Sequence, residues 1–167
     1  KLVFVSDGEV AVKAPDASTD PVLTISYGNT ILDFEAEVDA RDQLAAVATS
    51  SWNFASQEIA EGEAAEPSGP DQGAFSTSDL SDVVGLESFD LQHTGNVNDE
   101  ELKAWADSAL QRSRFAKVRG RVKCQGFAEV KPGDMIELTG LGDQFNGNAY
   151  VVAVRQDLTA SNWTTNI

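Results

Sequence analysis

The chain has 167 residues, 41% of them hydrophobic, which is enough for one ordinary core or two small ones and excludes several large domains. Its net charge is -15, with 3 basic and 21 acidic side chains in residues 1–101 but 9 basic and 6 acidic ones in residues 102–167. Because phosphate contacts dominate nucleic-acid binding and no apolar run could span a bilayer, we expect neither nucleic acid nor a membrane as partner. This uneven distribution of charge is typical of a protein that docks to another protein chain, and it is also compatible with an acidic surface that only keeps the protein in solution.

Four short strands are predicted near the start of the chain. Residues 2–5 and 9–13 flank an Asp-Gly pair, which is typical of a β-hairpin. Residues 23–27 and 31–38 flank a Gly-Asn-Thr turn and predict a second hairpin. The strand at 31–38 alternates acidic and apolar residues, so it should be half-buried. Since the first strand starts almost at residue 1, we expect the chain to be part of a longer protein.

The next pair of strands is less sharply marked. A helical turn or loop is predicted through Leu44, followed by a strand that ends at Trp52. A returning strand is predicted over 57–63, with Ile59 pointing inward.

An excursion follows, and it should interrupt the sheet. Residues 67–78 are rich in Gly, Pro and Ser and predict a loop. A short helix is expected over 80–86, with Ser78 or Asp79 as its N-cap, and a short strand over 87–92.

The principal helix is predicted over about 99–116. Acidic residues occupy its first turn and basic residues its last, as the helix dipole favours, and Asn98 or Asp99 can cap its start. One buried stripe at helical spacing contains Leu102, Trp105, Ala106, Ala109, Leu110 and Ser113.

Three strands should follow the helix. Residues 117–124 alternate basic and small apolar side chains. Residues 131–134 read Lys-Pro-Gly-Asp, as in a type II turn, and lead to strands at 135–138 and 150–155. Six to eight strands with one principal helix predict a mainly β fold: a β-barrel, sandwich or other closed antiparallel sheet with the helix packed on it.

The residues offer little for catalysis or metal binding. His93 is the only histidine and Cys124 the only cysteine, so a nucleophilic triad or a zinc site is not expected. Asp71, Asp79 and Asp82 lack the glycine and final glutamate of a calcium loop, and the glycines after residue 139 match no phosphate loop. We therefore expect no enzyme activity, no catalytic residue, no metal and no cofactor.

Two charged rows form the unusual feature of the sequence. The basic row would lie on one strand face and the acidic row on another; they contain Lys117, Arg119, Arg121 and Lys123, and Asp33, Glu35 and Glu37. Each could be a solvated strand face, and the acids could bind a cation or act as an acid-base pair in a hydrolase. The sharper interpretation is an inter-subunit surface, where the basic row of one copy meets the acidic row of the next.

The alternative function is a binding module for an oligosaccharide or single-stranded nucleic acid. The basic row, Trp52 and Trp163 would serve it, although only Phe115 and Phe127 flank the cations. This alternative predicts an exposed aromatic platform, whereas a structural role in an assembly predicts buried tryptophans and a large apolar or charge-matched interface.

The second half of the chain contains an ordered series of short motifs. They are ELKAWA at 101–106, RSR at 112–114, KVRGRV at 117–122, QG at 125–126, KPGD at 131–134 and FNG at 145–147. This series resembles the VgrG family, also called Rhs element Vgr proteins, which are related to late control D and hub proteins of contractile phage tails. The resemblance covers most of the chain from about Leu23 and is densest over 86–163.

The resemblance implies the hub of a spike in a contractile injection machine, either a type VI secretion system or a phage-tail-like particle. Such a hub is a homotrimer whose pseudo-sixfold ring joins a hexameric tube to the rest of the spike. Residues 1–22 would end a preceding hub segment, and residues 23–167 would form its second tube-like barrel, with the needle-bearing part beyond Ile167. The family has no catalytic residue in this region. The resemblance also implies that the protein is assembled in the bacterial cytoplasm and delivered outside the cell as part of the particle.

Overall fold

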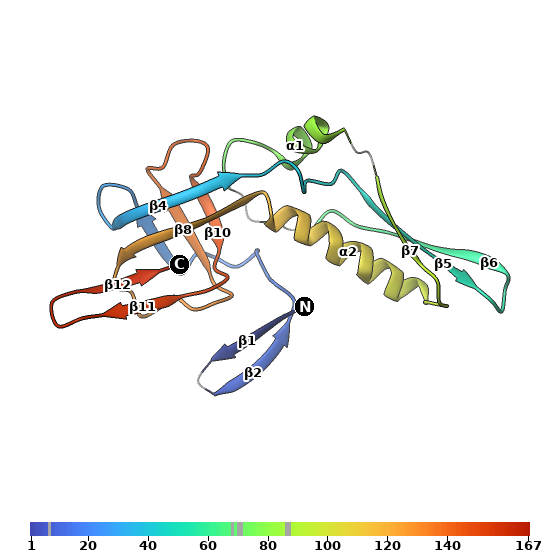
Figure 1. Ribbon diagram of the computed structural model, residues 1–167, viewed down its shortest axis with the longest axis horizontal. Helices are drawn as coiled ribbons and strands as arrows, with labels where there is room; N and C mark the ends of the chain where they lie inside the picture. Colours follow the sequence, from blue (N-terminus) through green and yellow to red (C-terminus); the bar gives the residue numbers. More distant parts are fainter. Residues whose placement is uncertain (7, 68, 70–71, 86–87) are drawn as a thin grey trace. The chain divides into compact units, whose positions relative to one another are not determined.

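The computed structural model describes residues 1–6, 8–67, 69, 72–85 and 88–167. The Asp of the first predicted turn, part of the loop at 67–78, including Asp71, and the junction at 86–87 lie outside the described residues. The fold is mainly β, with twelve strands and two helices described (Figure 1).

The chain forms two compact units, each built from separate stretches of sequence. Unit 1 comprises Lys1–Val38, Gly69–Ala74 and Val118–Ile167, and unit 2 comprises Asp39–Ser68 and Phe75–Lys117. These units are defined by spatial contacts within the chain. The predicted division into the end of a preceding hub segment (1–22) and a second barrel (23–167) refers to a larger hub protein, and it stays a prediction.

Unit 1 contains three sheets. The first is an antiparallel hairpin of β1 (Leu2–Ser6) and β2 (Glu9–Lys13), as predicted. The second has the order β10-β9-β3, with bounds Gly147–Tyr150, Met135–Thr139 and Leu23–Ser26. The third has the order β11-β12-β8-β4, with bounds Arg155–Leu158, Trp163–Asn166, Val118–Gln125 and Ile31–Val38.

The predicted hairpin of residues 23–38 is wrong, because its two strands belong to different sheets. β3 pairs in parallel with β9, with Leu23 opposite Ile136, whereas β4 pairs antiparallel with β8. The intervening turn is closed by the Thr30 amide, which donates to the Ser26 carbonyl at 3.0 Å. It redirects the chain from one sheet to the next, and both sheets then contribute to one core.

That core explains the arrangement of unit 1. It contains the buried residues Ile25, Val122, Cys124, Val130, Ile136, Leu138 and Val151. Val151 donates its amide to the Asp134 carbonyl at 2.9 Å, and the chain leaves the sheet there, so the predicted strand at 150–155 is interrupted between β10 and β11. In the part of the chain that the structure describes, no sheet closes into a barrel, which corrects the predicted closed sheet.

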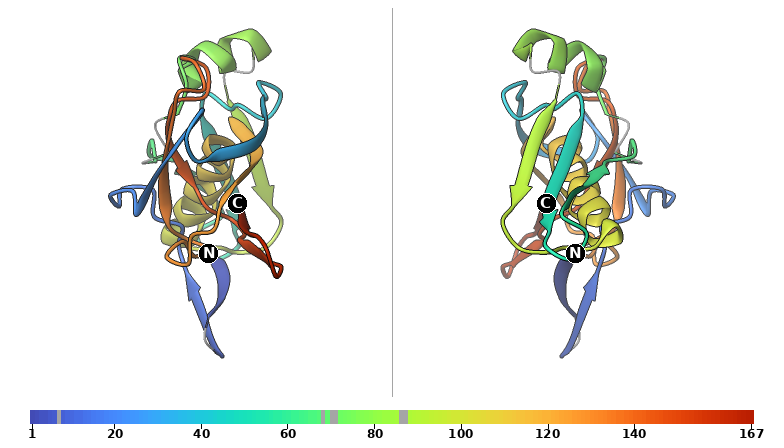
Figure 2. Two further views of the ribbon diagram at one scale, coloured as in Figure 1. Left: turned by 90° about the vertical axis from the view of Figure 1, so that its left-hand side faces the viewer. Right: turned by 90° about the vertical axis from the view of Figure 1, so that its right-hand side faces the viewer.

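Unit 2 is a three-stranded sheet covered on one face by a helix. The sheet has the order β6-β5-β7, with bounds Glu58–Glu63, Val47–Asn53 and Phe89–His93. Helix α2 (Asp99–Phe115) lies along β5 and β6 (Figure 2). Five of the six predicted stripe residues are buried, whereas Trp105 is half-buried, and Arg114 is buried as well. Ala106, Ala109 and Leu110 pack on Val47.

Helix ends in unit 2 follow ordinary capping rules. The Asn98 side chain accepts from the Glu101 amide at 2.8 Å, which confirms the predicted N-cap of α2. The short helix α1 (Thr77–Val84) begins earlier than predicted, because Ser76 is its N-cap and Asp79 completes a capping box.

The inward face of β6 also differs from the prediction. Ile59 is 61% exposed, and Gly62 instead lies on the face toward α2. A Cβ at Gly62 would come within 2.9 Å of the Lys103 amide nitrogen, so only glycine lets the helix backbone approach this closely.

Candidate interaction surfaces

The two charged rows face each other inside one chain. The antiparallel register of β4 and β8 pairs each acid of β4 with a base of β8: Asp33 with Lys123, Glu35 with Arg121 and Glu37 with Arg119. Directly opposed residues share one face of a sheet, so the two rows form a single charged ribbon. The complementarity read from the sequence is therefore met within one copy, and a contact with a second copy through this face stays a prediction.

An ion pair shows how these charges are used. Arg121 Nη2 donates to Glu35 Oε2 at 2.6 Å, and this hydrogen bond, with the carboxylate charge, raises the pKa of Arg121. The two side chains are 81% and 74% exposed, so water screens the attraction and it adds little to stability.

Lys117 does not belong to the ribbon. It is buried at the end of α2, before β8 begins, and its Nζ donates to the Phe75 carbonyl at 3.3 Å within unit 2. The alternation of basic and apolar residues in the sequence begins at Lys117, but strand β8 begins only at Val118. Lys117 therefore belongs to the junction between the helix and the strand.

A first apolar surface lies on the β1–β2 hairpin, which we call the valine face. It consists of Val3, Val5, Val10 and Val12, which are 61–70% exposed. The register places Val3 opposite Val12 and Val5 opposite Val10, so all four share one side of the ribbon.

The other side of this hairpin is turned toward the rest of unit 1. Phe4 is partly buried, and a Cβ at Gly133 would come within 2.9 Å of its ring. Lys13 Nζ lies 5.0 Å from the centre of the same ring, within the range of a cation–π contact. The valine face therefore points outward.

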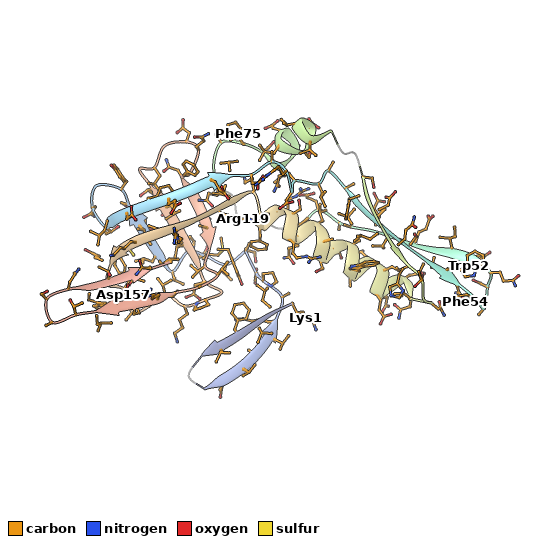
Figure 3. All side chains as sticks on the ribbon, in the orientation of Figure 1. Lys1, Trp52, Phe54, Phe75, Arg119 and Asp157 are labelled. Carbon is orange, nitrogen blue, oxygen red and sulfur yellow. The ribbon has the colours of Figure 1, made fainter. Side chains whose placement is uncertain are left out.

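A second apolar surface lies at the free end of the β5–β6 hairpin, and we call it the aromatic tip. Its members are Trp52, Phe54 and Ile59, which are 42%, 66% and 61% exposed. Trp52 lies opposite Ile59 in the register, and Phe54 follows in the turn; Figure 3 shows Trp52 and Phe54 at the same end of the hairpin.

The pattern of β5 explains why the aromatic tip is uncovered. Val47, Thr49 and Ser51 are buried, and Thr49 Oγ1 donates to the Leu102 carbonyl of α2 at 3.0 Å. Alternation then places Trp52 on the sheet face away from the helix. β6 carries three glutamates: Glu58 beside the turn, Glu61 two residues beyond Ile59, and Glu63 at the far end of the strand, opposite Ala48.

The valine face was not identified from the sequence, and of the aromatic tip only Trp52 was considered there as a binding residue. The signal for the valine face was present in the strand LVFVS, where large apolar residues occupy both faces, and in EVAVK, where two valines share one face. Such a ribbon has more apolar surface than one neighbour can cover.

The sites considered for chemistry stay separate. Among the described residues no three His, Cys, Asp or Glu side chains come together as a metal site. The His93 ring lies edge-on to Trp105 at 6.1 Å, and its Nδ1 accepts from the Gly95 amide at 3.0 Å. Burial raises the pKa of Cys124 to about 11, so its thiol stays protonated and is a poor nucleophile.

No helix in the described part of the chain is both long and apolar enough to cross a membrane.

The two candidate tryptophans lie in different units. Trp52 belongs to unit 2 and Trp163 to unit 1, and they are 42% and 41% exposed in the single chain. Trp163 Nε1 donates to Gln156 Oε1 at 2.8 Å, which holds the indole on its own hairpin. Burial of either ring in an assembly stays a prediction.

Comparison with known proteins adds a family and a fold. A family model described as the Alg8 N-terminal domain matches residues 1–160. No curated protein matches the chain.

Two solved structures are similar over almost all of it. The 43 kDa tail protein of prophage MuSo2 from Shewanella oneidensis has a TM-score of 0.59 and 9% identity, over 96% of this chain and 45% of that one. The tail protein from Neisseria meningitidis MC58 has a TM-score of 0.59 and 14% identity, over 96% of this chain and 46% of that one. The chain thus has a fold found in phage tail proteins and spans about half the length of each.

Proposed function

The chain belongs to the family of Alg8 N-terminal domains. We propose that it is a structural module of a phage-tail-like particle. The observation that carries the proposal is the likeness to two tail proteins over 96% of the chain. Such coverage includes strands and helices of both compact units, so the similarity is not that of one common supersecondary motif.

In its specific form, the proposal is a hub of the spike. Three copies would form a pseudo-sixfold ring that joins a hexameric tube to the remainder of the spike, in a type VI secretion system or a related injection particle. Membership of the VgrG family, assembly in the bacterial cytoplasm and export with the particle belong to this proposal. The chain would act by geometry and not by catalysis.

The surfaces of the chain support a role in assembly. The valine face and the aromatic tip expose apolar side chains on sheet surfaces, which is typical of contacts between protein chains. The charged ribbon, in contrast, sets acids opposite bases within one copy, with an ion pair between Arg121 and Glu35.

A binding module for an oligosaccharide or single-stranded nucleic acid is the second candidate, and the exposed Trp52 and Phe54 favour it. Nucleic acid is the less suitable ligand, because the nearby strand β6 carries three glutamates. Quenching of tryptophan fluorescence by a panel of oligosaccharides, lost in Trp52→Ala, would support this candidate.

The experiment that tests the hub is sedimentation across a concentration series. A trimer of 17.8 kDa chains, near 53 kDa, is expected. A species that stays at 17.8 kDa at every concentration, or that stops at a dimer, would contradict a trimeric ring formed by this chain.

A further inference from the structure

We propose that the valine face of one copy packs against the aromatic tip of the next copy around the ring. This inference rests on the proposed function and names the surfaces through which that assembly forms. The occupant of each apolar surface is thus a second copy of this chain.

The β1–β2 hairpin needs such a partner. An isolated two-stranded hairpin has only marginal stability in water. In this hairpin only the side that carries Phe4 lies against the rest of unit 1. Its four valines are 61–70% exposed, so they contribute to stability only when another surface covers them.

The two surfaces match in size. An aliphatic side chain presents roughly 60–120 Å² of apolar area, so the four partly exposed valines offer about 160–320 Å². A large aromatic side chain presents roughly 150–250 Å², so the aromatic tip offers about 200–340 Å². Each is about a third of the roughly 800 Å² that a partner buries in a standard interface, which suits an apolar centre surrounded by a polar rim.

The charges beside the two surfaces are complementary. Lys1 lies at the open end of the β1–β2 hairpin, two residues before Val3, whereas Lys13 belongs to the Phe4 side. On β6, Glu61 stands two residues beyond Ile59 and shares its sheet face, and Glu63 follows further from the aromatic tip on the same face. A rim that pairs lysine with glutamate favours this contact over one between two copies of the same surface.

Symmetry decides between the possible pairings. A contact between two valine faces would be isologous and would close as a twofold dimer. A ring of three copies contains only heterologous contacts, in which two different surfaces of the chain meet. The chain offers two such surfaces, one in each unit.

Cysteine cross-linking between two separately prepared chains tests the pairing. One chain carries Val10→Cys and the other, enlarged by a tag, carries Phe54→Cys. The native Cys124 is buried and stays silent, as the chain without either substitution will show. Mixing and mild oxidation should give a cross-link between the two different chains, visible by mass on a non-reducing gel.

A matched control uses Val152→Cys in place of Val10→Cys. Val152 is 78% exposed and also belongs to unit 1, but it lies outside the valine face. It should give less than about a tenth of the cross-linked product. Equal yields would overturn the proposal, as would cross-links that form only between two Val10→Cys chains.

A charge placed in the valine face gives an independent measurement. Val10→Asp should raise the dissociation constant of the trimer at least tenfold, while Val152→Asp should leave it within about twofold. Both variants should keep the native circular dichroism, because each site is exposed. A trimer that forms normally with Val10→Asp and without the Val10–Phe54 cross-link would overturn this inference alone, whereas monomers throughout would overturn the proposed ring as well.

Discussion

Ser113→Ala should destabilise unit 2, because this buried hydroxyl fastens the segment before β5 to helix α2. Ser113 Oγ donates to the Asp42 carbonyl at 2.7 Å and accepts from the Leu44 amide at 2.9 Å. Leaving the half-buried Leu44 amide unpaired costs about 1–3 kcal/mol, and the exposed Asp42 carbonyl can turn to water. The higher helix propensity of alanine returns at most about 0.7 kcal/mol. The net loss should be about 1–2 kcal/mol.

Urea unfolding followed by tryptophan fluorescence measures this loss, since Trp52 and Trp105 both lie in unit 2. Ser108→Ala is the matched control: it is the same change on the same helix, at a hydroxyl outside this set of hydrogen bonds. It should be neutral or stabilising by up to about 0.7 kcal/mol. If the two variants agree within about 0.5 kcal/mol, the Ser113 hydrogen bonds do not hold this segment.

Three further predictions concern the interior of the two units. Gly62→Ala should lower the free energy of unfolding in urea by about 1–2 kcal/mol, because the new Cβ would collide with the backbone of Lys103. This cost exceeds the gain from the lower conformational entropy of the unfolded chain, and an unchanged midpoint would contradict it. The hydrogen bond from Arg114, and then its charge, lower the pKa of Glu66, so this pair stabilises the fold above about pH 4.5 and the effect is lost as the pH falls toward the lowered value. Glu66→Gln should remove that part of the pH dependence, and equal slopes in both proteins would count against it. Cys124 should react with a thiol reagent at pH 8 only after unfolding, since burial raises its pKa to about 11; rapid reaction of the native chain would refute this.

Local signals in the sequence were enough to find most elements. The acidic start and basic end of α2, together with Asn98, predicted its bounds closely. Alternation predicted β4 and β8, and an Asp-Gly pair predicted the first hairpin. These features depend on neighbours within a few residues, which a sequence shows directly.

Pairing between distant strands could not be predicted in the same way. β3 lies beside β9 in a parallel register, although more than a hundred residues separate them. Alternation tells which side chains share a face, but it does not identify the partner strand. The turn after Ser26 therefore suggested a hairpin that the core does not use.

The candidate surfaces show the same limit. The complementarity of the charged rows was recognised, but opposite charges match equally well within a chain and between chains. Only the register, with Glu35 opposite Arg121, shows that they meet within one copy. The exposure of the valine face depends on which segments pack against it, and the strand pattern alone does not identify those segments.

The effect of salt on the trimer should separate the two kinds of surface. If the charged ribbon formed the contact between copies, salt would screen its ion pairs and dissociate the trimer. Contacts through the valine face and the aromatic tip are mainly apolar, and each copy carries a net charge of -15 that repels the others. Raising the salt concentration from about 0.05 to about 0.5 M shortens the Debye length from about 14 Å to about 4 Å and weakens that repulsion. The dissociation constant measured by sedimentation should then stay constant or fall, whereas a rise of tenfold or more would assign the contact to the charged ribbon.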